Sequence, residues 1–268
     1  MSPDYTTSPA PAPARLFISV VSHHNAEEII NALQPHRFVG PHSQVILLDN
    51  RPEKSLAHYA ADHQLHYLRN EQPQGFGANH NRVFRHCCDH LGLVPERDVF
   101  LVVNPDVVCG ARAPEQLAQE MLAHEAAIGA PNLFKDEAMT LHEQSVRRFP
   151  YLWDLLPSFL MRRNRTGIDR ARVTEPVAVD WASGACLAIR GDVFRQLDGF
   201  DERYFLYYED VDLCWRARRD LQVPVWYFPS VKLVHTGKRA SHGLFNRHLW
   251  WHLSSALRFA RVRHLGGR

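Results

Sequence analysis

The chain has 268 residues, and its 31 Lys and Arg against 29 Asp and Glu leave a formal net charge of +2. Hydrophobic residues make up 45% and charged residues 22%, which is ordinary for a globular protein and excludes a disordered, coiled-coil or collagen-like chain. No run reaches the roughly 18 apolar residues of a membrane span, and the first residues lack the apolar core of a secretory signal. The near-neutral charge predicts no general affinity for nucleic acid. The odd count of 5 cysteines, without CxxC spacing, favours free thiols in a reducing cytoplasm.

Three regions differ in composition. Residues 1–14 are rich in Pro, Ser, Thr and Ala, which predicts a disordered tail. Residues 15–242 are long enough for one large domain. Residues 243–268 are basic, and no Asp or Glu follows Asp220. We expect this last region to be an amphipathic helix and tail that either packs on the core or contacts an anionic membrane surface.

Strand-like and helix-like segments alternate along the first half of the chain. Apolar, β-branched runs predict strands at 16–21, 45–48, 66–68 and 99–103, and helical patterns lie between and after them at 26–33, 52–63, 79–91 and 114–124. This alternation predicts an α/β domain with a mostly parallel central sheet.

The second half is less regular. Residues 131–180 are mixed and rich in Arg, and we expect no clear element there. Further on we expect a strand over 179–189, then a short helix that begins at 191 and a second helix that ends at about 220. Short strands at 223–228 and 231–234 and a long helix over 244–263 follow.

Polar residues follow three of the predicted strands. Ser22 and Asn25 come after the first strand, Asp49 after the second, and Asn104 and Asp106 after the fourth. Ligands of open parallel sheets bind outside the carboxyl ends of the strands. The sequence therefore predicts a ligand site at this edge.

Two acidic motifs have the composition of a catalytic site. In Asn104-Pro-Asp106, a carboxylate directly after a buried strand suits a hard divalent cation bound to phosphate oxygens, although the same tripeptide also forms simple turns. In Glu209-Asp-Val-Asp212, three acids within four residues exceed what a helix cap requires. A positioned carboxylate such as Asp210 could serve as a general base.

A third motif runs from His235 to Ser241. A neutral histidine can bind a metal ion, and Lys238 and Arg239 with Ser241 suit diphosphate oxygens. The alternative is a capping loop with solvated charges.

Taken in order and at their spacing, these motifs resemble those of the family 2 glycosyltransferases with the GT-A fold, a Rossmann-like fold of nucleotide-diphospho-sugar transferases. The resemblance covers about residues 16–259 and is strongest to the bacterial O-antigen rhamnosyltransferases. It rests on Asp49-Asn50, Gly75-Phe-Gly77 with Asn81, Asn104-Pro-Asp106, Trp181-Ala-Ser-Gly184, the segment 199–213 and the segment 235–241. Segments 134–142, 145–150 and 179–181 resemble the rhamnosyltransferase subgroup in particular.

The resemblance implies a role for each matching residue. Asp210 would be the catalytic base, and Asp106 and His235 would bind Mg²⁺ or Mn²⁺. The nucleotide sugar would be bound by Ser22, Asn25, Asp49, Asn81, Asn104, Asp106, Arg147, Lys238, Arg239 and Ser241. Arg147 or Arg148 would contact either the donor phosphates or the acceptor pyrophosphate. The acceptor would be bound by Trp181, Ser183, Gly184 and Glu209. Asn104 replaces the first Asp of the family's DxD motif, which weakens the expectation of strict metal dependence.

The implied activity is inverting transfer of L-rhamnose from dTDP-L-rhamnose to a lipid-linked sugar, such as N-acetylglucosamine on undecaprenyl pyrophosphate, in cell-surface polysaccharide synthesis. The expected location is the cytoplasm, with peripheral contact at the inner membrane. Three alternatives remain: a different nucleotide sugar, a metal-dependent nucleotide-diphosphate hydrolase, and a non-catalytic nucleotide-binding regulator. Acceptor-independent release of phosphate would indicate the hydrolase, and tight binding without turnover would indicate the regulator.

Overall fold

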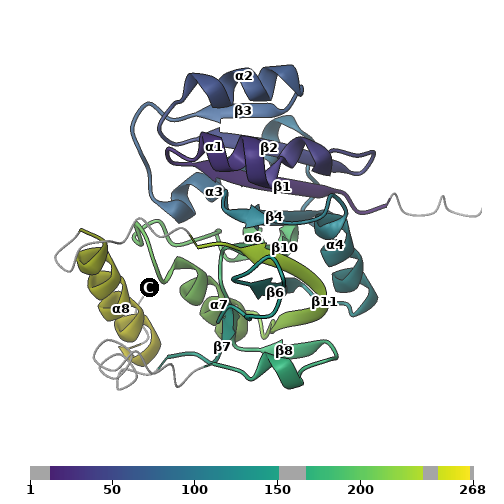
Figure 1. Ribbon diagram of the computed structural model, residues 1–268. Coiled ribbons are helices and arrows are strands. Elements are labelled where there is room, and N and C mark those ends of the chain that lie inside the picture. The colour runs from purple at the N-terminus through teal and green to yellow at the C-terminus, as the bar shows by residue number, and fades with distance from the viewer. Residues whose placement is uncertain (1–12, 151–166, 238–246, 266–268) are drawn as a thin grey trace, which may run out of the picture.

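A computed structural model describes residues 13–150, 167–237 and 247–265. The predicted N-terminal tail therefore lies almost wholly outside the described residues. A nine-stranded sheet runs through the molecule in the order β3-β2-β1-β4-β10-β6-β11-β5, with β8 paired to β11 (Figure 1). The strands are β1 (Leu16–Ser22), β2 (Ser43–Asp49), β3 (His66–Arg69), β4 (Val99–Val103), β5 (Val107–Val108), β6 (Ile128–Phe134), β8 (Val177–Val179), β10 (Cys186–Arg190) and β11 (Val225–His235).

Most of the strand pairing is parallel, as expected. β3, β2, β1 and β4 form one parallel group, and β6 and β11 form another. β10 lies between the two groups and is antiparallel to both β4 and β6. The single strand expected over 179–189 is instead divided among β8, β9 (Trp181–Ala182) and β10, and β9 pairs with β7 (Val146–Arg147) in a separate small sheet.

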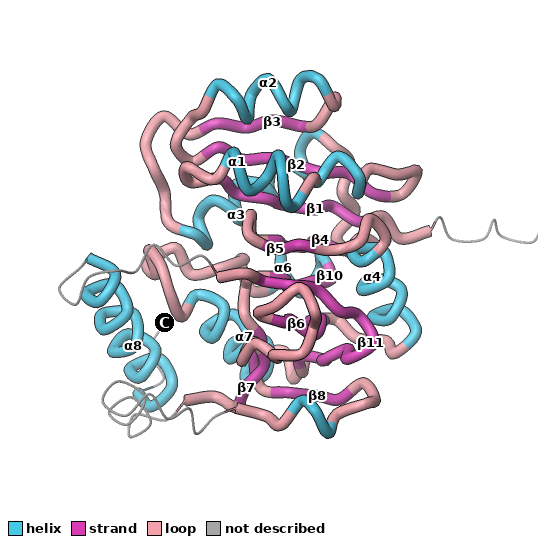
Figure 2. Tube along the Cα trace, in the orientation of Figure 1, coloured by secondary structure: helices cyan, strands magenta, loops and turns pink. Residues whose placement is uncertain are grey.

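Helices cover both faces of the sheet (Figure 2). One face carries α1 (Ala26–Glu28) with a π-helical turn over Ile29–Leu33, α2 (Lys54–Asp62) and α4 (Ala113–Ala123). The other carries α3 (Phe76–His90), α6 (Gly191–Gln196) and α7 (Glu209–Asp220). Short 3₁₀ turns lie at Pro35–Phe38 and Arg170–Arg172.

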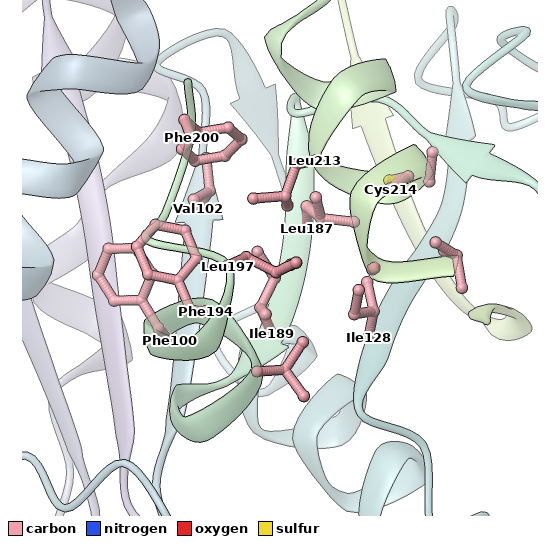
Figure 3. Packing of buried hydrophobic residues seen from close by; sticks show 14 of the residues in the cluster. Phe100, Val102, Ile128, Leu187, Ile189, Phe194, Leu197, Phe200, Leu213 and Cys214 are labelled. Atoms are coloured by element: carbon pink, nitrogen blue, oxygen red, sulfur yellow. The ribbon is translucent and has the colours of Figure 1, made fainter. Parts of the chain in front are cut away.

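The alternation of side chains along each strand explains this three-layer arrangement. In β4, Phe100 and Val102 point to the face with α3 and α6, while Val99, Leu101 and Val103 point to the other face. Successive residues of a strand point to opposite faces, so an uninterrupted apolar run is buried on both. Figure 3 shows Phe100 and Phe194 packed with Leu197 on the face that carries α3 and α6, with the α7 residue Leu213 nearby.

The strand β6 was not expected from the sequence. It is fully buried but contains Gly129, Pro131 and Asn132, which are rare in central strands. Proline is tolerated because β6 pairs with β10 only through Ile128 and Gly129. On the other side, β11 shifts register between Phe228 and Lys232 directly after the Pro131 pairing. The two short strands expected at 223–228 and 231–234 are the halves of this irregular β11.

The helix expected over 244–263 is found as α8 (Arg247–Leu265). It lies at the periphery beside α7 (Figure 1). Its Phe259 ring lies 6.5 Å from that of Trp215 on α7. Ala256, Phe259 and Val262 are buried, so one side of the helix packs on the core. None of the helices in the described ranges combines the length and apolar character needed to cross a membrane.

Candidate functional site

The carboxyl ends of β1, β2 and β4 meet at one edge of the sheet. Ser22 and Asp49 are direct register partners, and β4 continues beyond Val103 into Asn104 and Asp106. The predicted polar strand ends are thus brought together. The turn after β1 is tied to the strand, because the Asn25 N–H donates to Ser22 Oγ at 3.1 Å.

Asp49 is fully buried at this edge and has one oxygen without a partner. Its Oδ2 accepts the Glu53 N–H at 2.7 Å and the Tyr67 hydroxyl at 3.0 Å. Its Oδ1 has no hydrogen-bond partner among the described residues. Burial raises the pKa of Asp49, although the hydrogen bonds from Glu53 and Tyr67 and the Arg51 backbone oppose that shift. A buried acceptor without a partner is costly unless a ligand supplies the donor.

Asp106 and His235 face each other across the ends of β4 and β11. Asp106 Oδ1 lies 3.1 Å from His235 Nε2, and Glu143 Oε2 lies 2.7 Å from His235 Nδ1. Burial alone would lower the pKa of His235, but the hydrogen bonds and negative charges of the two carboxylates raise it to about 9. The same contact holds the pKa of Asp106 below its usual value despite burial.

The residues at this position fit a divalent cation that also binds a diphosphate. Asp106 would supply a carboxylate oxygen, and His235 would supply Nε2 after that nitrogen has released its proton, since a metal ligand must be deprotonated. Mg²⁺ usually takes one or two carboxylates together with substrate phosphates and water. Glu143 contacts the opposite nitrogen of the same ring and so orients the ring rather than sharing a metal centre with it. Accordingly, the described ranges contain no group of three or more metal-ligating side chains around one point.

Asp210 occupies the first turn of α7, where the residue is partly exposed. Its Oδ2 accepts the Gly184 N–H at 2.9 Å and its Oδ1 the Val211 N–H at 2.8 Å. Burial raises the pKa of Asp210, while these hydrogen bonds and the charge of Arg147 oppose the shift. The resulting carboxylate is fixed in direction and has the character of a general base.

The two neighbouring acids differ from Asp210. Asp212 is 1% exposed and forms a salt bridge of 2.6 Å with Arg216, which in turn donates to the Gly199 carbonyl. Glu209 is 5% exposed, and its Oε2 has no partner among the described residues. Burial and the charge of Asp210 raise the pKa of Glu209 well above its usual value. The structure therefore separates the cluster into one accessible and two buried carboxyl groups.

Residues assigned to the acceptor lie beside Asp210. The β7–β9 pair aligns Arg147 with Trp181, and the Arg147 guanidinium lies 5.6 Å from the centre of the Trp181 ring. Ser183 N–H donates to the Ser145 carbonyl at 2.7 Å. One residue beyond Gly184, the Ala185 carbonyl accepts the Asn104 N–H at 2.8 Å. The DxD-like turn, the 181–184 segment and Asp210 are consequently parts of one site.

Two groups of expected residues are not placed in this site. Asn81 on α3 is buried, and its amide accepts the Phe200 N–H at 2.9 Å and donates to the Phe200 carbonyl at 2.8 Å, so it ties the helix to the 199–202 turn. Lys238, Arg239 and Ser241 lie outside the described residues.

Close backbone packing explains the Gly75-Phe-Gly77 motif. A Cβ on Gly75 would lie 2.8 Å from the Phe205 carbonyl oxygen, and one on Gly77 would lie 2.6 Å from the Phe200 Cβ. Glycine lets the start of α3 lie directly against the 200–205 segment that leads to Asp210. The two glycines therefore allow the close packing of α3 against this segment.

Sequence reasoning missed the role of Glu143 and the conformation of the residues just before Asp210. Glu143 is separated from His235 by 92 residues, so only the fold reveals their contact. Tyr207 and Tyr208 both have left-handed backbone conformations, with φ of 72° and 68°. Such conformations cost of order 1–3 kcal/mol each in residues other than glycine, and they cluster at functional sites.

The fold is a mixed β-sheet between two layers of helices, with polar residues at the carboxyl ends of its parallel strands. Together with the DxD-like turn and the positioned carboxylate, this arrangement is typical of the GT-A class of glycosyltransferase. Comparison with known proteins agrees: residues 22–197 match the model of glycosyl transferase family 2, and the chain belongs to that family. The solved mannosyltransferase PcManGT from Pyrobaculum calidifontis, in complex with GDP-Man and Mn²⁺, shares the fold with a TM-score of 0.58 at 12% identity. That match covers 95% of this chain and 63% of the other.

Two curated relatives are similar in sequence. The rhamnosyltransferase WbbL of Escherichia coli (strain K12) is 31% identical, and the match covers 94% of this chain and 96% of that protein. The N-acetylglucosaminyl-diphospho-decaprenol L-rhamnosyltransferase of Mycobacterium tuberculosis (strain CDC 1551 / Oshkosh) is 32% identical over 72% of this chain, and the match spans 65% of that enzyme.

Proposed function

We propose that this glycosyltransferase moves L-rhamnose from dTDP-L-rhamnose to a hydroxyl of a lipid-linked sugar, with N-acetylglucosamine on undecaprenyl pyrophosphate as the acceptor. The product would enter O-antigen or another cell-surface polysaccharide, and the reaction would take place on the cytoplasmic face of the inner membrane. The similarity to two rhamnosyltransferases supports the sugar, and the name of the mycobacterial relative supports the acceptor class.

The observation that carries the proposal is the carboxylate of Asp210, which belongs to the one partly exposed acid of the 209–212 cluster and accepts the Gly184 N–H. In the proposed step, an acceptor hydroxyl oxygen attacks the anomeric carbon and gives its proton to Asp210. The bond to the diphosphate breaks, and dTDP leaves with the electron pair. Direct displacement inverts the anomeric centre. General-base assistance of this kind typically contributes about 10²–10⁴-fold to the rate.

The donor would be bound at the carboxyl edge of the sheet. The free Oδ1 of Asp49 would accept the ring N–H of the thymine base, with Ser22 and Asn25 in the same pocket. Asp106 and His235 would hold Mg²⁺ or Mn²⁺ against the diphosphate, where a divalent cation stabilises the developing negative charge of the leaving group. Glu143 keeps the His235 ring in position.

The acceptor would lie on the side of Asp210 that faces away from the donor, next to residues 181–184. The Trp181 ring offers an apolar face for a sugar, and the Arg147 guanidinium next to it suits a pyrophosphate oxygen. The segment 181–184 is anchored through Ser183 and Gly184, so these contacts are preorganised relative to the base.

The test is release of dTDP from dTDP-L-rhamnose by the purified full chain, with Mg²⁺ or Mn²⁺, with and without a short-chain lipid-pyrophosphoryl-N-acetylglucosamine acceptor. We expect release only with the acceptor, and a product heavier by one deoxyhexose. Equal release without the acceptor would indicate a hydrolase instead. Tight nucleotide binding without release, across a panel of nucleotide sugars, would indicate a non-catalytic regulator.

A further inference from the structure

The C-terminal helix α8 presents an apolar stripe away from the core. Trp250, Leu253 and Leu257 are 72%, 41% and 55% exposed. Their spacing of three and four residues places them on one side of the helix, with Arg261 one turn further along the same side. The buried residues Ser255, Phe259 and Val262 lie on the other side. A helix that packs on its core normally exposes polar residues outward, so this face needs a partner.

The charge of the helix indicates which partner. The sequence of α8, RHLWWHLSSALRFARVRHL, contains four arginines and no acidic residue. Arg258 and Arg263 lie over aromatic rings of the protein, whereas Arg261 is exposed on the same side as the apolar stripe. An outward Trp and two Leu on a basic helix, with an exposed Arg beside them, suit the interface of an anionic bilayer. Phe205, itself 40% exposed, adds apolar surface nearby, because its ring lies 4.8 Å from that of Trp251.

The inner side of the same helix contacts the segment that leads to the catalytic base. The Ser255 hydroxyl donates to the Leu206 carbonyl at 3.1 Å. The His252 ring lies 5.3 Å from that of Tyr207 and 5.5 Å from that of Tyr208. Since Tyr207 and Tyr208 have left-handed backbones, external packing must hold them in place. α8 supplies that packing, directly before Asp210.

We propose that α8 is a membrane-docking helix: its outer face, formed by Trp250, Leu253 and Leu257, binds an anionic lipid bilayer, while its inner face holds segment 205–208 and thereby positions Asp210. The proposal rests on the proposed function in one respect, since a lipid-linked acceptor gives the docking its purpose. Docking on α8 brings the membrane surface next to the acceptor side of the site, so a sugar on a pyrophosphate-linked lipid reaches Asp210 without leaving the bilayer.

Vesicle co-sedimentation of the full chain tests the outer face without any substrate. We expect binding to vesicles of phosphatidylglycerol and phosphatidylethanolamine, weaker binding to phosphatidylcholine alone, and weakening by salt. The double variant Trp250→Ser, Leu257→Ser should lower the partition coefficient at least roughly tenfold. The matched control is Leu122→Ser with Val39→Ser, which removes apolar groups that are 59% and 52% exposed elsewhere and should bind like the wild type.

Three outcomes would overturn docking: no binding to anionic vesicles, wild-type binding by the α8 variant, or a concentration-dependent dimer that the α8 variant abolishes. The last outcome would make a second copy of the chain the partner. None of these measurements requires turnover, so failure of docking and failure of rhamnosyl transfer are distinguishable.

The inner face is tested by Ser255→Ala, which removes the hydrogen bond to Leu206. We expect kcat on a water-soluble acceptor to fall by roughly fivefold, with nucleotide affinity and vesicle binding unchanged. On the same acceptor, the outer-face double variant should retain wild-type kcat and lose activity only when the acceptor is presented in vesicles. An unchanged kcat for Ser255→Ala, or a parallel loss of nucleotide binding, would contradict the positioning role.

Discussion

Replacing Asp210 with Asn removes the proposed base and preserves the shape of the side chain. Asp210 accepts two backbone N–H groups, from Gly184 on Oδ2 and from Val211 on Oδ1. Asn has a single acceptor oxygen, so one N–H loses its partner, but the substitution also removes a buried negative charge whose desolvation raises the pKa. Because these two effects oppose each other, we expect only a small change in the free energy of unfolding. The loss of the base should lower kcat by about 10²–10⁴-fold, which corresponds to about 3–5 kcal/mol of transition-state stabilisation.

A matched control is available on α6. Asp192 also lies in the first turn of a helix, and its Oδ1 accepts the Val193 N–H at 2.8 Å, as Asp210 Oδ1 accepts that of Val211. Asp192 also forms an ion pair with Arg190 at 2.6 Å, which Asn would weaken. Asp192→Asn should therefore lower stability while leaving kcat unchanged.

The assay is initial-rate transfer at saturating donor and acceptor, with calorimetric titration of dTDP and urea unfolding of both variants. A loss in kcat of less than about tenfold for Asp210→Asn would refute the base assignment. An equal loss of kcat in the two Asn variants, or a parallel loss of nucleotide binding in Asp210→Asn, would also refute it.

Three further results are expected. Burial raises the pKa of Asp210, and a general base must be ionised to act. On acidification, kcat should therefore begin to fall at a pH above the ordinary pKa of a carboxyl group. A fall in kcat only at or below that ordinary pKa would contradict this. Gly77→Ala would place a Cβ 2.6 Å from Phe200 and should destabilise the fold by about 1–3 kcal/mol in urea unfolding, whereas Gly110→Ala, with open space around it, should be neutral; equal effects would refute the close-packing argument. In Asp49→Asn the amide oxygen must take the position of Oδ2, which accepts two donors, so the NH₂ group faces the ligand. The affinity for dTDP, measured by calorimetry, should therefore fall about tenfold or more. Unchanged affinity would show that Asp49 does not bind the thymine.

The sequence predicts the first half of the fold well because its strands are long apolar runs. Residues 99–103 and 45–48 are buried on both faces, so composition and periodicity both indicate strands. The same reasoning fails for β6, where Gly129 and Pro131 lack strand propensity and only an incomplete pairing with β10 makes room for proline.

The candidate site is predicted in part for a related reason. Ser22 and Asp49 are the last residues of their strands and Asp106 lies shortly after another, so chain position alone places them at one edge. Contacts between distant segments are not visible in this way. The Glu143–His235 hydrogen bond and the packing of α8 against residues 205–208 depend on the completed fold. Residue types alone do not separate Glu209, Asp210 and Asp212, and only the family resemblance assigns Asp210 as the base and Glu209 to the acceptor. The burial of Glu209 and Asp212 is visible only in the structure.

The central claim is direct displacement at the anomeric carbon with Asp210 as the only base. The most direct measurement is the anomeric configuration of the transferred sugar, determined by NMR on the product of the full chain and compared with that of the donor. We expect the opposite configuration to that in the nucleotide sugar, because a single displacement inverts the centre. Retention of the donor's configuration would require a different catalytic arrangement and would contradict the assignment of Asp210.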